Sequence, residues 1–209
     1  MNTKKILIRI IVLLLICVFS FISIYFNSEH IGDYCYRNKM YFPAKIFFKI
    51  SYAHNNENKL LKKIWESLKI TDYNDIVYYG EKLIDNEDYL NSNGEEFVRT
   101  VKLGYMIALY ESGRKEKFFE FYTNNINKFE NAIDERKLIL DTIVINPESE
   151  NDDYRFAIKE YEYILSVSDK IKKADLLIIY GNLKEMYSKI GNNELAKKYQ
   201  DLYNDIIGK

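Results

Sequence analysis

The chain opens with an apolar run over residues 6–26, ILIRIIVLLLICVFSFISIYF, in which Arg9 is the only charged residue. At a rise of about 1.5 Å per residue, a helix of this length crosses the roughly 30 Å hydrocarbon core of a bilayer. In lipid a helix satisfies every backbone hydrogen bond within its own segment. The run therefore predicts a transmembrane helix over residues 6–26.

Basic residues at the start of the run predict its orientation. Lys4, Lys5 and Arg9 precede or open it, whereas Glu29 and Asp33 follow it. Basic residues are retained on the cytoplasmic side of a membrane segment. We therefore expect a single-pass membrane protein with residues 1–5 in the cytoplasm and an extracytoplasmic domain.

Two other interpretations of the N-terminus stay open. A cleaved signal peptide also has basic residues followed by an apolar core, and it would leave a secreted protein. The run is long for that, however, and no A-x-A-like site follows Phe26. A lipoprotein is the least favoured, because Ile16 stands before Cys17 where a small residue is needed.

The composition of the remaining chain favours helices. Eight Gly and two Pro in 209 residues provide little material for hairpin turns or flexible linkers. Residues 27–209 suffice for one domain with a sizeable core. With 30 Lys and Arg against 31 Asp and Glu, the chain also lacks the basic balance of a nucleic-acid-binding protein. We predict an all-α domain that does not bind nucleic acid.

Five segments of the domain are similar to one another, namely residues 40–48, 72–79, 113–122, 153–161 and 191–199. Each has a small or apolar residue followed by aromatic residues about one helical turn later. The equivalent small or apolar positions are Ala44, Ile76, Phe118, Ala157 and Ala196. Their spacings of 32, 42, 39 and 39 residues predict degenerate repeats.

The last copy resembles a tetratricopeptide repeat (TPR). The matching aromatic, leucine, glycine and alanine positions are Tyr180, Leu183, Tyr187, Gly191, Ala196 and Tyr203. Lys184 and Gln200 depart from the family pattern, and the usual closing proline is absent. The resemblance implies a TPR-like α-solenoid of about five helical hairpins over residues 27–209. We place them at 29–54, 57–88, 95–130, 133–167 and 170–207.

Loops are expected to take up the extra residues of the long repeats. Residues 91–94 are turn-forming, and Pro147 interrupts any helix within residues 146–151. The first hairpin has room to continue directly from the membrane helix. An ordinary closed bundle of amphipathic helices is the competing fold, and it would leave no groove for a partner.

The TPR resemblance implies a groove lined by the first helix of each hairpin, which binds other proteins or peptides. The groove-facing positions of the family fall on Leu103, Ile107, Tyr110, Gly181, Glu185 and Ser188. Packing or plain solvent exposure is the alternative for all six. The Lys–Asn pair that grips a terminal carboxylate in some members is not matched, because Ser188 follows Lys184.

No chemistry-bearing motif is recognisable. His30 and His54 lack a metal-ligand spacing, and the common nucleotide-binding and hydrolase fingerprints are absent from the sequence. Acidic residues 148–153 favour the capped start of a helix over a calcium loop. Trp65 follows an apolar pattern typical of a core residue. We therefore predict no catalytic residue, metal or cofactor, and no enzyme.

These expectations favour a membrane-anchored interaction scaffold that recruits or assembles partners at the bacterial envelope. A membrane-tethered regulatory or immunity-type protein that neutralises one toxin or enzyme is an alternative. So is a secreted repeat protein after signal cleavage, and an enzyme with an unrecognised site also stays open. An intermolecular disulfide through Cys35, the cysteine outside the apolar run, would be compatible with any of them.

Overall fold

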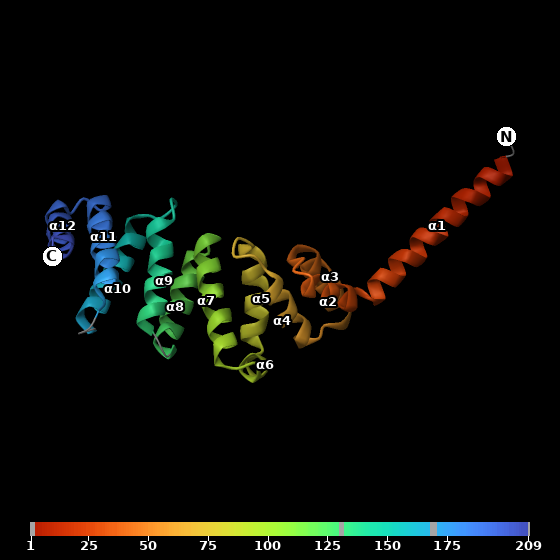
Figure 1. Ribbon diagram of the computed structural model, residues 1–209, viewed down its shortest axis with the longest axis horizontal. Helices are drawn as coiled ribbons and strands as arrows, with labels where there is room; N and C mark the ends of the chain where they lie inside the picture. The colour runs from red at the N-terminus through yellow and green to blue at the C-terminus, as the bar shows by residue number, and fades with distance from the viewer. Residues whose placement is uncertain (1–2, 130–131, 168–170, 209) are drawn as a thin grey trace. The chain divides into compact units, whose positions relative to one another are not determined.

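The computed structural model describes residues 3–129, 132–167 and 171–208, with side chains from residue 10 onward. Regular secondary structure within these ranges is helical, so the all-α prediction is confirmed (Figure 1). The elements are α1 (Thr3–Phe26), α2 (Ser28–Arg37), α3 (Tyr41–Asn55), α4 (Asn58–Ser67), α5 (Tyr73–Asp85), α6 (Glu87–Ser92), α7 (Glu95–Glu111), α8 (Lys115–Asn125), the 3-10 helix η1 (Ile126–Lys128), α9 (Ala132–Ile145), α10 (Asn151–Val167), α11 (Lys173–Lys189) and α12 (Asn193–Ile207).

Paired helices follow one another along the chain. α2 packs on α3, α4 on α5, α9 on α10 and α11 on α12, while the Tyr110 and Phe118 rings join α7 to α8. These five pairs lie where the sequence predicts hairpins. Residues 130 and 170, at the ends of two predicted hairpins, lie outside the described residues, as do the side chains of Lys4, Lys5 and Arg9.

Three of the hairpins turn in the same way. Lys39, Gly113 and Gly191 have positive φ angles of 59°, 75° and 79°. In each turn the next amide donates to the carbonyl five residues back, as Asn192 does to Tyr187 at 2.8 Å. This is the hydrogen bond of a Schellman motif, which satisfies a free carbonyl at the helix end. Gly113 and Gly191 are the turn glycines that the repeat alignment predicts.

The five aligned positions of the repeats are all buried. Four of them are the fourth residue of their helix, namely Ala44, Ile76, Phe118 and Ala196. Ala157 is instead the seventh residue of α10, because that helix begins three residues earlier relative to the alignment. The sequence similarity thus corresponds to a shared packing position, with a shifted helix start in one copy.

The loop predicted at residues 91–94 is shorter than expected, because α6 extends to Ser92 and only Asn93 and Gly94 form the turn. α6 begins after Asn86, whose side chain accepts a hydrogen bond from the Tyr89 amide at 3.4 Å. Leu90 is buried within the core of this part of the chain. The cap and the buried leucine stabilise a helical turn where the polar composition alone favours a loop. The chain leaves α6 through Gly94, with φ +89°.

The acidic segment before α10 caps that helix, as the sequence predicts. The Asp153 carboxylate accepts a hydrogen bond from the Glu150 amide at 2.8 Å and forms an ion pair with Lys115 at 2.6 Å. Asp153 is the third residue of α10. A side chain at this position that accepts a hydrogen bond from the amide of the residue just before the helix forms half of a capping box. The preceding helix α9 ends at Ile145, so Pro147 lies outside both helices.

The chain divides into two compact units, residues 1–105 and 106–209. The core of unit 1 includes Phe48, Leu60, Ile64 and Leu83. The core of unit 2 contains charged groups: Arg136, on α9, pairs with Glu160 of α10. The prediction that residues 27–209 form one continuous repeat domain stays a prediction.

The N-terminal helix is apolar and exposed from residue 10 to residue 26. Counting only described side chains, no single helix meets the length and hydropathy expected of a membrane span. The consecutive helices Ile10–Phe26 and Ser28–Arg37 meet it together, bent by 68°. By length and composition this pair has the character of a broken membrane span or a signal sequence.

The first hairpin does not continue the helix of the apolar run, although the sequence leaves room for that, because the chain bends between α1 and α2. Asn27 lies at the bend, and its side-chain amide donates to the Ser23 carbonyl at 2.8 Å. The buried Ser28 hydroxyl donates to the Tyr25 carbonyl at 2.9 Å. Such side chains compete with the helical backbone for hydrogen bonds and frequently bend helices. Two polar residues therefore end the apolar helix.

Candidate partner-binding cleft

An open cleft of about 720 Å³ lies in unit 1 between α2, α4 and α7. These are the first helices of three consecutive hairpins. Tyr36 enters from α2, Trp65 from α4 and Phe97 from α7. Ile70, just beyond α4, lies on the rim with 75% of its surface exposed. Aromatic and aliphatic side chains thus form most of a cleft that is open to solvent.

Two glycines position the indole of Trp65 in the cleft wall. A Cβ on Gly104 would lie 3.0 Å from Cζ2 of Trp65, and one on Gly80 would lie 3.1 Å from Cζ3. Such distances are tighter than ordinary carbon contacts of about 3.5–4.0 Å. The helices α5 and α7 can approach the ring only because both positions lack a side chain. Trp65 is consequently half-buried against the core and also lines the cleft.

Charged groups surround the apolar wall of the cleft. Lys62 Nζ donates to the Asn93 side chain at 3.0 Å and lies 5.0 Å from the centre of the Phe97 ring. Glu66 is one helical turn further on, 4.0 Å from the same ammonium. Partial burial, and then the charge of Glu66, raise the pKa of Tyr36. The Tyr36 hydroxyl therefore stays neutral and can donate or accept a hydrogen bond in the cleft.

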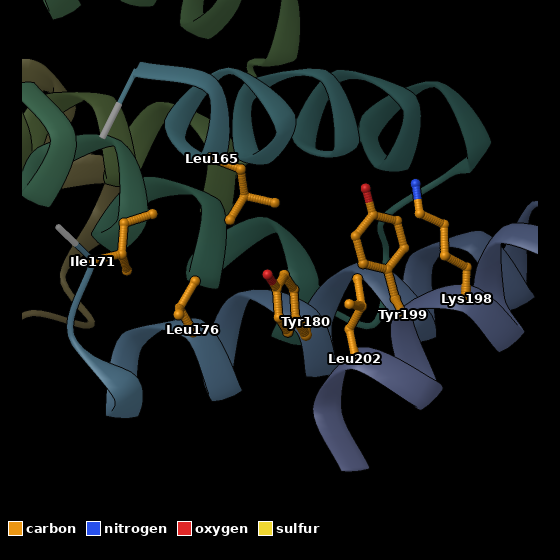
Figure 2. A pocket seen from close by; sticks show the side chains of 7 residues that line it. All are labelled: Leu165, Ile171, Leu176, Tyr180, Lys198, Tyr199 and Leu202. Carbon is orange, nitrogen blue, oxygen red and sulfur yellow. The ribbon is translucent and has the colours of Figure 1, made fainter. Parts of the chain in front are cut away.

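Unit 2 has a smaller cavity of about 400 Å³ near its C-terminal hairpin. Figure 2 shows Leu165 of α10 and Leu176 and Tyr180 of α11 around it, with Leu202 of α12. The Tyr180 ring lies 5.9 Å from that of Tyr199. Most of the side chains around the cavity are therefore apolar or aromatic.

A carboxylate next to this cavity holds two tyrosines in place. The Tyr187 and Tyr199 rings stack at 5.6 Å, and both hydroxyls donate to Glu162, at 2.7 and 3.2 Å. Burial, followed by the Glu162 charge, raises the pKa of Tyr199 to about 12. The two hydroxyls are neutral donors with a fixed acceptor, which suits packing of the α10, α11 and α12 helices.

Three of the predicted groove residues lie on α7. Leu103 and Tyr110 are only 9% and 2% exposed, and Ile107 is half-buried. The Tyr110 hydroxyl is 2.7 Å from the Ser149 hydroxyl, in the segment between α9 and α10. The residues with which α7 lines the cleft of unit 1 are Glu96, Phe97, Thr100 and Gly104. The burial of Leu103 and Tyr110 suits the packing alternative for these positions.

The other three predicted residues, Gly181, Glu185 and Ser188, lie on α11. Glu185 and Ser188 are exposed, and Gly181 is partly exposed. Glu185 pairs with Lys189 at 3.7 Å, one helical turn away. They share a helix with Leu176 and Tyr180 but are not among the residues around the cavity of unit 2. Binding through any of the six residues stays a prediction.

Cysteine and histidine are placed away from the cleft. Cys35 is buried on α2, so its thiol is not accessible for the intermolecular disulfide that the sequence leaves open. The His54 ring contacts the Tyr25 ring at 4.4 Å, next to the end of α1. Among the described side chains, no three His, Cys, Asp or Glu are grouped as metal ligands would be.

The sequence singles out the first helices as the source of a groove but misses the cleft residues themselves. Its apolar pattern assigns Trp65 to the core and does not select Tyr36 or Phe97. Phe97, Thr100 and Gly104 recur at helical spacing, a signal that marks a shared face without telling which face is open. Comparison with protein-family models, with curated proteins and with solved structures finds no match for this chain.

Proposed function

We propose that the chain is a membrane-anchored protein–protein interaction scaffold of the bacterial envelope. Its binding site is the cleft between α2, α4 and α7. The observation that carries the proposal is the exposure of Trp65, Ile70 and Phe97 side chains in one concave surface. Partially exposed aromatic residues in a concave surface are the usual anchoring points of protein interfaces.

The chemistry of the cleft favours a peptide or helix with an apolar anchor. An aliphatic or aromatic side chain of the partner fits between Trp65 and Phe97, where it is removed from water. Lys62 and Lys69 lie among the lining residues together with Glu66 and Glu96. Charges of both signs at the rim favour a partner of mixed charge over a strongly acidic or basic one.

The repeat interpretation supports this choice of surface. In a TPR-like array the first helices line the binding face, and α2, α4 and α7 are first helices. The shared turns after α2, α7 and α11 and the buried aligned positions are those expected of a degenerate array. We propose that five such hairpins form the TPR-like solenoid.

The proposed anchor is the apolar segment over residues 6–26. Its basic start places residues 1–5 in the cytoplasm and the helical domain outside. α2 begins two residues after α1 ends, so the cleft is held near the bilayer surface. A scaffold in this position meets partners that are themselves in or close to the membrane.

Site-specific photo-cross-linking in intact cells tests the proposal. A photoreactive amino acid replaces Ile70 on the cleft rim, and in a control it replaces Tyr78, which is 55% exposed and does not line the cleft. We expect a discrete cross-linked protein from position 70 and not from position 78. A second substitution, Thr100→Arg, fills the cleft and is expected to abolish that product.

The outcomes distinguish specific binding of a partner in the cleft from cross-linking by random collision. A product from position 70 that survives Thr100→Arg, or appears equally from position 78, contradicts the proposed site. Recovery of the uncross-linked protein alone from position 70 contradicts the scaffold proposal itself. Far-ultraviolet circular dichroism of the Thr100→Arg protein checks that the helical fold is retained.

A further inference from the structure

The side of α2 that faces α4 is charged. Glu29 and Asp33, one helical turn apart, both accept from Lys63 of α4, at 3.0 and 2.7 Å. The opposite side of α2 carries Ile31, about half a helical turn from both charged residues, and Tyr34, about 100° around the helix from Asp33. Tyr34 is 66% exposed. One side of this helix is therefore held by ion pairs, and the other has no charged residue before Arg37 in its last turn.

The second helix of the hairpin repeats this division. Lys45 and Lys49 of α3 pair with Asp75 of α5, at 3.4 and 2.6 Å. On the opposite side of α3, Phe47, Ile50 and His54 recur at helical spacing. All three are partly exposed. Both helices of the first hairpin thus have an uncharged side turned away from the second hairpin.

We call these residues the α1-side face: Asn27, Ile31 and Tyr34 with Phe47, Ile50 and His54. It contains no Asp, Glu, Lys or Arg, although 29% of the chain is charged. The terminal hairpin of a helical array ordinarily has a polar outer face that keeps it soluble. A face in this position that combines three apolar side chains with no charge calls for a surface less polar than water.

The end of α1 lies against this face. Tyr25 and Phe26 contact the His54 ring, at centroid distances of 4.4 and 6.3 Å. α1 also contacts α2 and α3. The uncharged side of the hairpin is therefore directed toward the helix that we propose as the membrane anchor.

The angle between α1 and α2 determines what this face meets. The two helices are bent by 68°, so α2 departs by a steep angle from the anchor direction. Membrane helices are tilted on average by about 20° from the bilayer normal, and a tilt of this size in the plane of the bend, in the sense that adds to it, brings α2 nearly parallel to the bilayer surface. The face directed toward α1 then meets the headgroup layer.

We infer that the α1-side face rests on the lipid headgroup layer and fixes the orientation of the first hairpin on the membrane; this inference rests on the proposed anchor. Tyr and His have an apolar body and a polar tip, which suits the interface between hydrocarbon and water. Ile50 contributes apolar surface at the same depth, together with the parts of Ile31 and Phe47 that are not packed against the core. Arg37, exposed in the last turn of α2, pairs with anionic headgroups beside the face.

Depth-dependent fluorescence quenching of the full chain tests the inference. The protein is reconstituted in vesicles of phosphatidylethanolamine and phosphatidylglycerol that carry bromine atoms near the headgroup end of the acyl chains. Trp65, the single tryptophan, is replaced by Phe. One new tryptophan is then placed on the face by Tyr34→Trp. Tyr78→Trp, at a similarly exposed tyrosine of α5, is the matched control, and Phe21→Trp reports on the anchor.

We expect about a twofold loss of emission from the Tyr34→Trp protein, since aromatic side chains at the interface lie at headgroup depth. The Tyr78→Trp protein is expected to lose none, and the Phe21→Trp protein is expected to be quenched. Quenching of Phe21→Trp with equal emission from the other two overturns the inference and leaves the anchor standing. The inference is also overturned, and the anchor also stands, if the Tyr34→Trp protein is protected from quenching by aqueous iodide but is not quenched by bromolipid. In that case protein, and not lipid, covers the face. Unquenched Phe21→Trp overturns the anchor and the inference together.

Discussion

The packing of Gly32 of α2 against Phe48 of α3 allows a stability prediction that can be worked out from distances. A Cβ on Gly32 would lie 2.6 Å from both Cδ1 and Cε1 of Phe48. That is about 1 Å inside ordinary carbon contact. Phe48 is only 1% exposed and belongs to the core of unit 1, so its ring cannot move outward into solvent. Gly32→Ala therefore forces the two helices apart.

Two opposing effects decide the size of the change. Alanine is favoured over glycine in a helix interior by about 1 kcal/mol. Overpacking a closed core costs about 1–3 kcal/mol, and two ring contacts this short favour the upper end. We expect Gly32→Ala to lower the free energy of unfolding of unit 1 by about 2 kcal/mol. For a unit of this size that corresponds to roughly 10 °C in Tm.

Gly181→Ala is the matched control in unit 2. A Cβ there would meet only Cε2 of Tyr203, at an ordinary 3.8 Å. The helix preference for alanine then acts alone, and we expect a gain of about 1 kcal/mol. The two glycine substitutions, one on α2 and one on α11, therefore have opposite signs.

The assay is thermal unfolding of the purified full chain in detergent micelles, followed by far-ultraviolet circular dichroism. Hydrogen exchange of the α2 and α11 amides assigns each change to its unit. In a Phe48→Leu background the penalty of Gly32→Ala should become smaller, because leucine lacks the ring carbon Cε1 and its shorter side chain can rotate away. A Gly32→Ala protein as stable as wild type, or a penalty that is undiminished in the Phe48→Leu background, would refute the steric reasoning.

Three further outcomes follow from charges and burial. Burial raises the pKa of Glu29, but hydrogen bonds to Lys63 and then Lys59 outweigh it and hold the pKa below its usual value. The interaction of Glu29 with Lys63 therefore stabilises the fold above the pKa that Glu29 has in the unfolded chain, and this stabilisation is lost as the pH falls through its pKa in the folded chain. Lys63→Met should consequently lower the free energy of unfolding by about 1 kcal/mol near neutral pH and leave it unchanged at acid pH. Denaturant titrations at neutral and acid pH check this. Arg136→Met leaves the Glu160 carboxylate, whose side chain is only 16% exposed, with the Tyr122 hydroxyl and no counter-charge, and should cost about 3 kcal/mol by urea unfolding. Cys35 should resist a membrane-impermeant thiol reagent, whereas Lys197→Cys, on the exposed side of α12, should label in intact cells if the domain is exported; labelling only after lysis reverses the orientation.

Local sequence patterns determined the elements of this protein. The apolar run, the near absence of Pro and Gly and the helical spacing of apolar residues predicted an all-α chain. The aligned repeats, together with the resemblance to tetratricopeptide repeats, predicted the five helix pairs. Gly113, Gly191 and Pro147 marked helix ends because their backbone preferences act within a few residues of chain. Each of these signals is local, so it can be read without knowledge of the fold.

Only the tertiary structure decided which sides of those helices are open. Phe97 and Leu103 are both apolar residues of α7, yet Phe97 lines a cleft and Leu103 is buried. The difference arises from the neighbouring helices that cover each side, and neighbours brought together by folding leave no mark on one helix's own sequence. The bend at Asn27 and the helix α6 depend in part on neighbours from elsewhere in the chain. The Tyr25 ring contacts His54 next to the bend, and Leu90 of α6 is buried in the core; both contacts exist only once the chain has packed.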